Sequence, residues 1–162
     1  MAKIIVVDAS VVAKWYLKER WRDNAINLRN DYVEGRIDLA APSIMPFEVL
    51  NAIRYSRKDL KAEVLEGIAE SLSLYGIKLY ELKDEYAKKT ARLSIEKNIT
   101  IYDASYLALA IKLKTKLYTA DEKLINKLDI EDRKYVKHIS TYQSTHQPHS
   151  IQANTNQKSK TR

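Results

Sequence analysis

The amino-terminal run Ile4-Ile5-Val6-Val7-Asp8 constrains this chain more than any other stretch, because four β-branched residues lead directly into an acid. The run is too short for a typical helix and has no polar alternation. Those properties are typical of a strand buried on both faces in the middle of a parallel sheet. Asp8 would then end the strand, at the edge where open α/β sheets bind ligands.

After Asp8, segments with strand character alternate with segments whose apolar residues recur at helical spacing. Such alternation favours an α/β fold with a mainly parallel sheet. Ser10 and Ser43 are placed to cap helices that follow them, and Gly35 is placed to end one. The predicted strands cover residues 4–7, 37–40, 77–80, 116–119 and 135–139, and the predicted helices cover residues 11–19, 23–33, 47–55, 61–74, 84–97, 104–113 and 122–128.

The chain of 162 residues is long enough for one domain with a substantial core. Its composition changes abruptly at Gln143, after which Gln, Asn, Ser and Thr dominate and the only charged residues are Lys158, Lys160 and Arg162. Such a segment lacks the apolar residues that a core requires. We therefore expect a folded domain over residues 1–142 and a disordered polar, basic tail over residues 143–162.

The charge balance favours a polyanionic partner, nucleic acid first, because 28 Lys and Arg against 21 Asp and Glu give a net charge of +7. The absence of cysteine excludes disulfides, thiolate zinc sites and cysteine nucleophiles. No apolar run is long enough for a signal-peptide core or a membrane span. The expected location is therefore the cytoplasm, without a membrane partner.

Several enzyme classes are excluded by what the chain lacks. Its three glycines are isolated, so neither a dinucleotide-binding fingerprint nor a P-loop is present. Two of the three histidines, His146 and His149, fall in the expected tail, which argues against a Ser-His-Asp triad or a histidine-rich zinc site. A haloacid-dehalogenase-type phosphatase would need an acid at the position of Ser10.

Carboxylates are the remaining catalytic candidates. Asp8 and Asp121 follow predicted strands, while Asp103 and Glu48 each interrupt an apolar neighbourhood. Buried carboxylates are costly unless they are paired or bind a metal. A cluster of oxygen ligands suits Mg²⁺ or Mn²⁺, which can activate water and stabilise an attacked phosphodiester.

Each acid also has a purely structural interpretation. Asp103 and Asp121 could cap the helices that follow them, and Glu48 could be an ordinary solvated helix residue. Asp8, at the end of a buried strand, is the hardest to explain structurally. Taken together, the four acids favour a site.

Four short motifs in this order resemble those of the PIN-domain ribonucleases, and most nearly the VapC toxins of prokaryotic toxin–antitoxin pairs. Each motif is weak alone, but four in order are specific, and the resemblance extends over about residues 3–139. The motifs are Asp8-Ala-Ser-Val-Val-Ala-Lys-Trp-Tyr16, Glu48-Val-Leu-Asn-Ala52, Tyr102-Asp-Ala-Ser-Tyr-Leu-Ala-Leu-Ala110 and Thr119-Ala-Asp-Glu-Lys-Leu124.

The resemblance implies a three-layer α/β/α sandwich and an endoribonuclease that depends on Mg²⁺ or Mn²⁺ and leaves a 5′-phosphate. It also implies a homodimer, an RNA substrate and an inhibitory antitoxin. The residue roles that it implies are metal binding by Asp8, Glu48, Asp103 and Asp121, with support from Ser10, Asn51 and Thr119.

Basic residues could bind the RNA backbone, although an ordinary solvated helix face explains them slightly better. The two tryptophans are more typical of core or dimer contacts than of base stacking. Two alternatives to a toxin stay open, a housekeeping PIN nuclease in RNA maturation and a non-catalytic RNA-binding or interaction protein with the same fold. The basic candidates are Lys14, Arg54, Arg57 and Lys58.

Overall fold

A five-stranded parallel sheet forms the centre of the protein, whose computed structural model describes residues 2–144. The strand order is β3-β2-β1-β4-β5, and every neighbouring pair is parallel. The expected α/β fold with a parallel sheet is confirmed. The strands are β1 (Lys3–Val7), β2 (Ile37–Pro42), β3 (Lys78–Tyr80), β4 (Leu117–Thr119) and β5 (Val136–His138).

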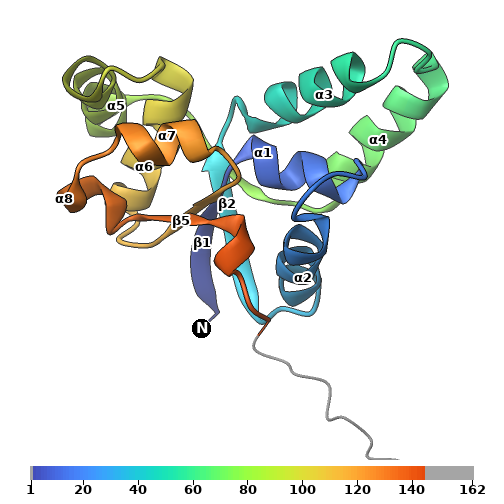
Figure 1. The fold of residues 1–162 in the computed structure, drawn as a ribbon, viewed down its shortest axis with the longest axis horizontal. Helices are drawn as coiled ribbons and strands as arrows, with labels where there is room; N and C mark the ends of the chain where they lie inside the picture. The colour runs from blue at the N-terminus through green and yellow to red at the C-terminus, as the bar shows by residue number, and fades with distance from the viewer. Residues whose placement is uncertain (1, 145–162) are drawn as a thin grey trace, which may run out of the picture.

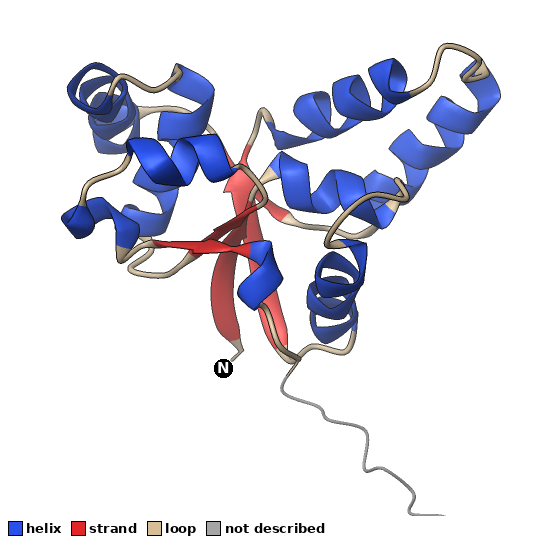
Figure 2. Ribbon diagram, viewed as in Figure 1, coloured by secondary structure: helices blue, strands red, loops and turns tan. Residues whose placement is uncertain are grey.

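Helices cover both faces of this sheet, so the molecule has three layers (Figures 1 and 2). Helices α1 to α4 lie on one side, with α3 and α4 extending away from the sheet, and α5 to α8 lie on the other. The helices are α1 (Ala9–Val12), α2 (Arg22–Val33), α3 (Met45–Ser56), α4 (Ala62–Leu74), α5 (Asp84–Lys97), α6 (Ile101–Lys112), α7 (Glu122–Lys127) and α8 (Ile130–Arg133), with 3₁₀ turns at Ala13–Trp15 and Ile139–Thr141.

The strand order reverses between β1 and β4. The chain moves outward from β1 through β2 to β3, then crosses back to place β4 on the other side of β1. Such a reversal separates the connections that leave the two strands, which opens a crevice at their carboxyl ends. Asp8 immediately follows β1, and Asp121 is the second residue after β4.

The core explains why β1 and α6 lie at the centre. Val6 and Val7 are fully buried between the two helical layers, as expected for a β-branched central strand. Seven consecutive residues of α6, from Ala104 to Ala110, are buried, and the helix contacts β1, β2 and β4. The small alanines allow this close approach. The packing of α6 against the sheet therefore holds the first turn of α6 at a defined position relative to the end of β1.

Helix starts are where the sequence-based expectations need correction. Ser10 does not cap a helix, because α1 begins at Ala9 and continues only to Val12 before a 3₁₀ turn. Ser43 is not a cap either, since Ile44 holds that position and no side chain caps α3. The prediction for α5 matches its bounds, whereas the four-residue α8 was not predicted. Gly35 does end α2, with a φ of +72° that favours glycine.

The carboxyl-terminal segment packs against α2. The side-chain amide of Asn24 donates to the carbonyls of Ser140 and Tyr142, at 3.2 Å each. Ser144 donates to Asp31 at 2.7 Å, so part of the segment assigned to the tail has a defined contact. The rest of the predicted tail, residues 145–162, lies outside the described residues. No helix within residues 2–144 combines the length and apolar character needed to cross a bilayer.

Candidate active site

The four predicted acids come from four separate elements that meet at the carboxyl end of the sheet. Asp8 follows β1, Glu48 lies in the first turn of α3, Asp103 in the first turn of α6, and Asp121 directly before α7. Each is electrostatically coupled to at least one other acid of the set. The fold therefore brings together carboxylates that are up to 113 positions apart, since 121 minus 8 is 113.

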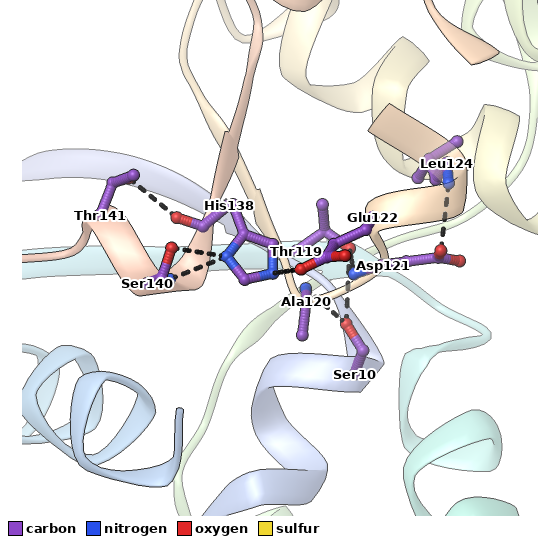
Figure 3. A network of polar contacts seen from close by, with 9 residues as sticks. All are labelled: Ser10, Thr119, Ala120, Asp121, Glu122, Leu124, His138, Ser140 and Thr141. Atoms are coloured by element: carbon purple, nitrogen blue, oxygen red, sulfur yellow. Dashed lines mark hydrogen bonds and ion pairs between the residues drawn. The ribbon is translucent and has the colours of Figure 1, made fainter. Parts of the chain in front are cut away.

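Two hydroxyls hold Asp8 by one oxygen atom. Ser10 Oγ and Thr119 Oγ1 donate to Asp8 Oδ2 at 2.6 and 2.7 Å. The same hydroxyl oxygens accept from the backbone N–H groups of Ala120 and Asp121, both at 3.0 Å (Figure 3). Together with the bonds to Asp8, this network joins the end of β1 to the loop after β4. Ser10 and Thr119 thus lie where the resemblance placed them, beside an acid.

The other oxygen of Asp8 is left open. No hydrogen bond within residues 2–144 reaches Oδ1, and Oδ1 is not among the buried polar atoms that lack a partner, so it keeps contact with solvent. Burial raises the pKa of Asp8 despite the two hydroxyl donors, and the charges of Asp103 and Asp121 raise it further. Asp8 is therefore an oriented carboxylate that forms no ion pair with a Lys or Arg of residues 2–144.

Glu48 is held by Tyr106, which was not among the predicted site residues. The Tyr106 hydroxyl, on α6, donates to Glu48 Oε1 at 2.8 Å. Burial raises the pKa of Glu48 to about 7, because the Tyr106 bond offsets it only in part and the charges of Asp8 and Asp103 add to it. A tyrosine in the most apolar helix needs a partner for its hydroxyl, and that requirement was the available signal for Tyr106.

Asp103 and Asp121 differ in their structural roles. Asp103 is not the cap of α6, because the helix begins at Ile101 and Thr100 Oγ1 accepts from the Asp103 N–H at 3.0 Å. Burial raises the pKa of Asp103, and Asp121 contributes to the shift. Asp121 does cap α7, since its Oδ1 accepts from the Leu124 N–H at 3.0 Å. Capping engages that one oxygen of Asp121.

The donor chemistry of this site fits a hard divalent cation. The four acids offer only oxygen atoms, which Mg²⁺ and Mn²⁺ prefer, and Mg²⁺ usually binds through one or two carboxylates and several waters. Among the residues that the structure describes, no three Asp, Glu or His side chains lie close enough to hold one ion directly. The arrangement therefore fits an ion bound partly through water better than a closed cage of carboxylates.

The remaining predicted residues lie farther from Asp8. Lys14 is buried and its Nζ pairs with Glu19 at 3.0 Å, so it does not lie on an open helix face, and its contact with RNA stays a prediction. Asn51 is exposed one turn after Glu48, and no hydrogen bond within residues 2–144 joins it to the four acids.

The other three predicted cations are exposed toward the far end of α3. Arg54 lies over the ring of Tyr55 at 5.2 Å, and Arg57 pairs with Asp59 at 3.1 Å. Lys58 follows in the loop after α3. Arg54 follows Glu48 by six residues and Arg57 follows it by nine, which is about two helical turns along α3, so these cations could contact only RNA that extends beyond the acids.

His138 is a second residue near the acids that the sequence reading did not select. It ends β5, opposite Thr119 in the strand register, and its Nε2 lies 4.0 Å from Glu122 Oε1 (Figure 3). Its Nδ1 accepts from the Ser140 N–H at 3.1 Å, which leaves the proton of a neutral ring on Nε2, toward Glu122. The position of His138 at the carboxyl end of a predicted strand was the available signal.

Comparisons with known proteins identify the family and the fold. Residues 5–130 match the PIN domain family. The chain is 33% identical over 132 residues to Ribonuclease VapC3 of Pyrobaculum aerophilum, which covers 76% of this chain and 93% of that protein. It is also similar in fold to the crystal structure of PAE2754 from the same organism, with a TM-score of 0.59, 22% identity and coverage of 87% of this chain and 94% of that one.

Proposed function

Because this chain belongs to the PIN-domain family and is of the VapC type, we propose that it is an endoribonuclease that hydrolyses RNA phosphodiester bonds with the aid of Mg²⁺ or Mn²⁺. One observation carries the metal dependence. Asp8, Glu48 and Asp103 each have a pKa raised by burial and by neighbouring acids. A divalent cation would remove that repulsion and lower all three pKa values.

The residues have distinct roles in the proposed reaction. Ser10 and Thr119 hold Asp8 through Oδ2, which would leave Oδ1 to bind the ion, and Tyr106 holds Glu48 through Oε1, which would leave its other oxygen for the same purpose. Asp121 and Asp103 supply the remaining negative charge. A bound ion would acidify a water molecule and stabilise the charge on the attacked phosphate. The product end groups that we expect are a 5′-phosphate and a 3′-hydroxyl.

The proposed context is that of a toxin in a type II toxin–antitoxin pair, in the cytoplasm, as a homodimer inhibited by an antitoxin protein. The name of the Pyrobaculum relative supports this choice over a housekeeping PIN nuclease in RNA maturation. The presence of all four acids argues against a non-catalytic RNA-binding protein, since such a protein has no need to keep four carboxylates that repel one another.

The test is cleavage of RNA by the purified chain with Mg²⁺ or Mn²⁺, followed by EDTA. We expect hydrolysis that stops with EDTA and resumes when excess Mg²⁺ is added. The new 5′ ends should be phosphorylated, which a 5′-phosphate-dependent exonuclease detects. Cleavage that continues undiminished in EDTA would contradict the metal mechanism.

A further inference from the structure

Trp21 has a backbone conformation that bulky residues rarely adopt. Its φ is +66° and its ψ is 15°, in the left-handed region, immediately before α2. A side chain as large as indole is strained there, and the surrounding structure must hold it. Residues in such conformations cluster at binding and active sites, so the position of the Trp21 ring needs an explanation.

The ring of Trp21 has an unusual set of neighbours. The guanidinium carbon of exposed Arg20 lies 4.5 Å from the ring centroid, in cation–π geometry. The imidazole of His138 meets the indole edge-on, with centroids 5.8 Å apart and planes at 83°. Arg22 follows Trp21, and its Nε is a buried nitrogen without a hydrogen-bond partner among the described residues. One cation, Arg20, therefore lies against a half-buried aromatic ring, and a second, Arg22, is its neighbour in sequence.

This group lies at the same carboxyl end of the sheet as the acids. His138 is opposite Thr119 in the register of β4 and β5, and Thr119 donates to Asp8. Neighbouring strands are about 4.8 Å apart, so Trp21 is displaced from Asp8 by roughly two strand spacings plus one ring contact. A single-stranded RNA bound at the acids and continuing past β5 would reach the indole.

We propose that Arg20 and Trp21 form a stacking platform for an unpaired RNA base a few nucleotides from the cleaved bond, with His138 holding the indole in place. The inference rests on the proposed function, because it assigns a subsite to the same RNA. Arg20 contributes both its planar face and a charge for the adjoining phosphate. Stacking on aromatic rings tolerates any base, so the platform positions the strand without reading its sequence.

The chain provides its own spectroscopic reference for this platform. It has two tryptophans, and the other, Trp15, is 3% exposed with its Nε1–H donating to the Ala25 carbonyl at 3.0 Å. A base that stacks on Trp21 should quench its fluorescence and leave that of Trp15 unchanged. The probe is a short single-stranded RNA of mixed sequence, added to an Asp8→Asn protein so that no cleavage occurs. An abasic strand of the same length and charge serves as the comparison.

Three further variants are made in the Asp8→Asn background. Trp21→Leu should weaken RNA binding roughly ten-fold, a typical loss for one stacked base. Trp21→Phe should retain most of the affinity, and Arg20→Ala should show an intermediate loss. Tyr135→Leu is the matched control, because Lys134 lies 5.6 Å from the Tyr135 ring in the same kind of pair. That pair lies at the amino end of β5, whereas Trp21 contacts His138 at the carboxyl end. That variant should bind like the parent.

The outcomes separate this proposal from the proposed function. Quenching by the RNA but not by the abasic strand, together with weaker binding only for Trp21→Leu and Arg20→Ala, would support the platform. If the chain with Asp8 intact cleaves RNA while Trp21→Leu binds as tightly as its parent, the platform is overturned and the nuclease stands. A circular dichroism melt of each variant identifies any loss of RNA affinity that is caused by unfolding. Equal losses of affinity for Trp21→Phe and Trp21→Leu would make Trp21 a packing residue and overturn the proposal.

Discussion

Two buried aspartates, Asp8 and Asp31, have opposite electrostatic surroundings. Asp8 is 8% exposed and Asp31 is not exposed at all. Burial raises the pKa of Asp8, with nearby acids adding to the effect. Burial also opposes ionisation of Asp31, but hydrogen bonds from Tyr142, Ser144 and Arg36 outweigh it and lower its pKa.

The contacts of Asp31 explain this difference. Its Oδ2 accepts from the Tyr142 hydroxyl at 2.6 Å, and its Oδ1 accepts from Ser144 Oγ at 2.7 Å and from Arg36 Nε at 2.8 Å. The guanidinium supplies the opposite charge within the protein, and Glu34 also pairs with it. Asp31 thus joins α2 to the carboxyl-terminal segment. Burial alone therefore does not indicate a functional acid. Asp8 differs from Asp31 because its charged neighbours, Asp103 and Asp121, raise its pKa rather than lower it.

The largest effect should come from Asp8→Asn. Because Asp8 would lose a charged oxygen ligand, Mg²⁺-dependent cleavage should fall by more than the roughly 10–100-fold typical when only a supporting residue of a metal site is removed. The metal-free fold should be as stable as the parent or more stable, because repulsion with Asp103 and Asp121 is relieved. Mg²⁺ should raise the melting temperature of the parent more than that of the variant.

The measurement is a pair of melting curves and cleavage assays for each protein, with and without Mg²⁺. Asp103→Asn should behave in the same direction. If both variants destabilise the metal-free protein and still cut RNA at the parent rate, the acids are structural and the comparison with Asp31 fails.

Asp31→Asn should have the reverse profile. Removing one partner of a buried ion pair should cost about 2–4 kcal/mol of unfolding free energy, since Arg36 and the two hydroxyls lose their charged acceptor. Cleavage per folded molecule should remain at the parent level. Urea unfolding gives the free energy, and Tyr142→Phe, which removes only one hydroxyl donor, should lose less. A strong loss of activity in fully folded Asp31→Asn would mean that the two aspartates do not differ in the proposed way.

The smallest effect concerns pH. Glu48 binds its proton more tightly in the folded chain, with a pKa of about 7, than at its ordinary value of 4.5. The contribution of Glu48 to the stability of the metal-free protein should therefore be greatest below about pH 4.5 and should decline as the pH rises from there through about 7. After allowance for solvent screening the decline is about 1–2 kcal/mol. Melting temperatures between these pH values should change less for Glu48→Gln, and an unchanged slope would contradict the raised pKa.

Much of the fold could be predicted because its signals are local. The β-branched run ending at Val7 and the apolar stretch around Leu107 identify the central strand and the buried helix without reference to distant residues. The acids could be selected for the same reason, since each interrupts or ends such a stretch. Residues whose roles depend on partners far along the chain were harder to assign.

Ser10 illustrates that limit. A hydroxyl before a helical pattern predicts a cap, but Ser10 donates to Asp8 and accepts from Ala120, which is 110 positions away. Tyr106 similarly meets Glu48 across 58 positions, and His138 meets Trp21 only after β5 has joined the sheet. Asp31 gave no signal at all, because a single acid in a polar helix resembles an ordinary surface residue.

The hydrogen bond between Thr119 and Asp8 spans 111 positions and has a consequence for synthesis on the ribosome. The nascent chain exposes Asp8 first but lacks its partner until β4 has been translated. At about 5–20 residues per second, that interval is roughly 6–20 s. Contacts so distant in sequence also form slowly after release. A ribosome making this protein therefore carries a chain without an assembled site for most of translation.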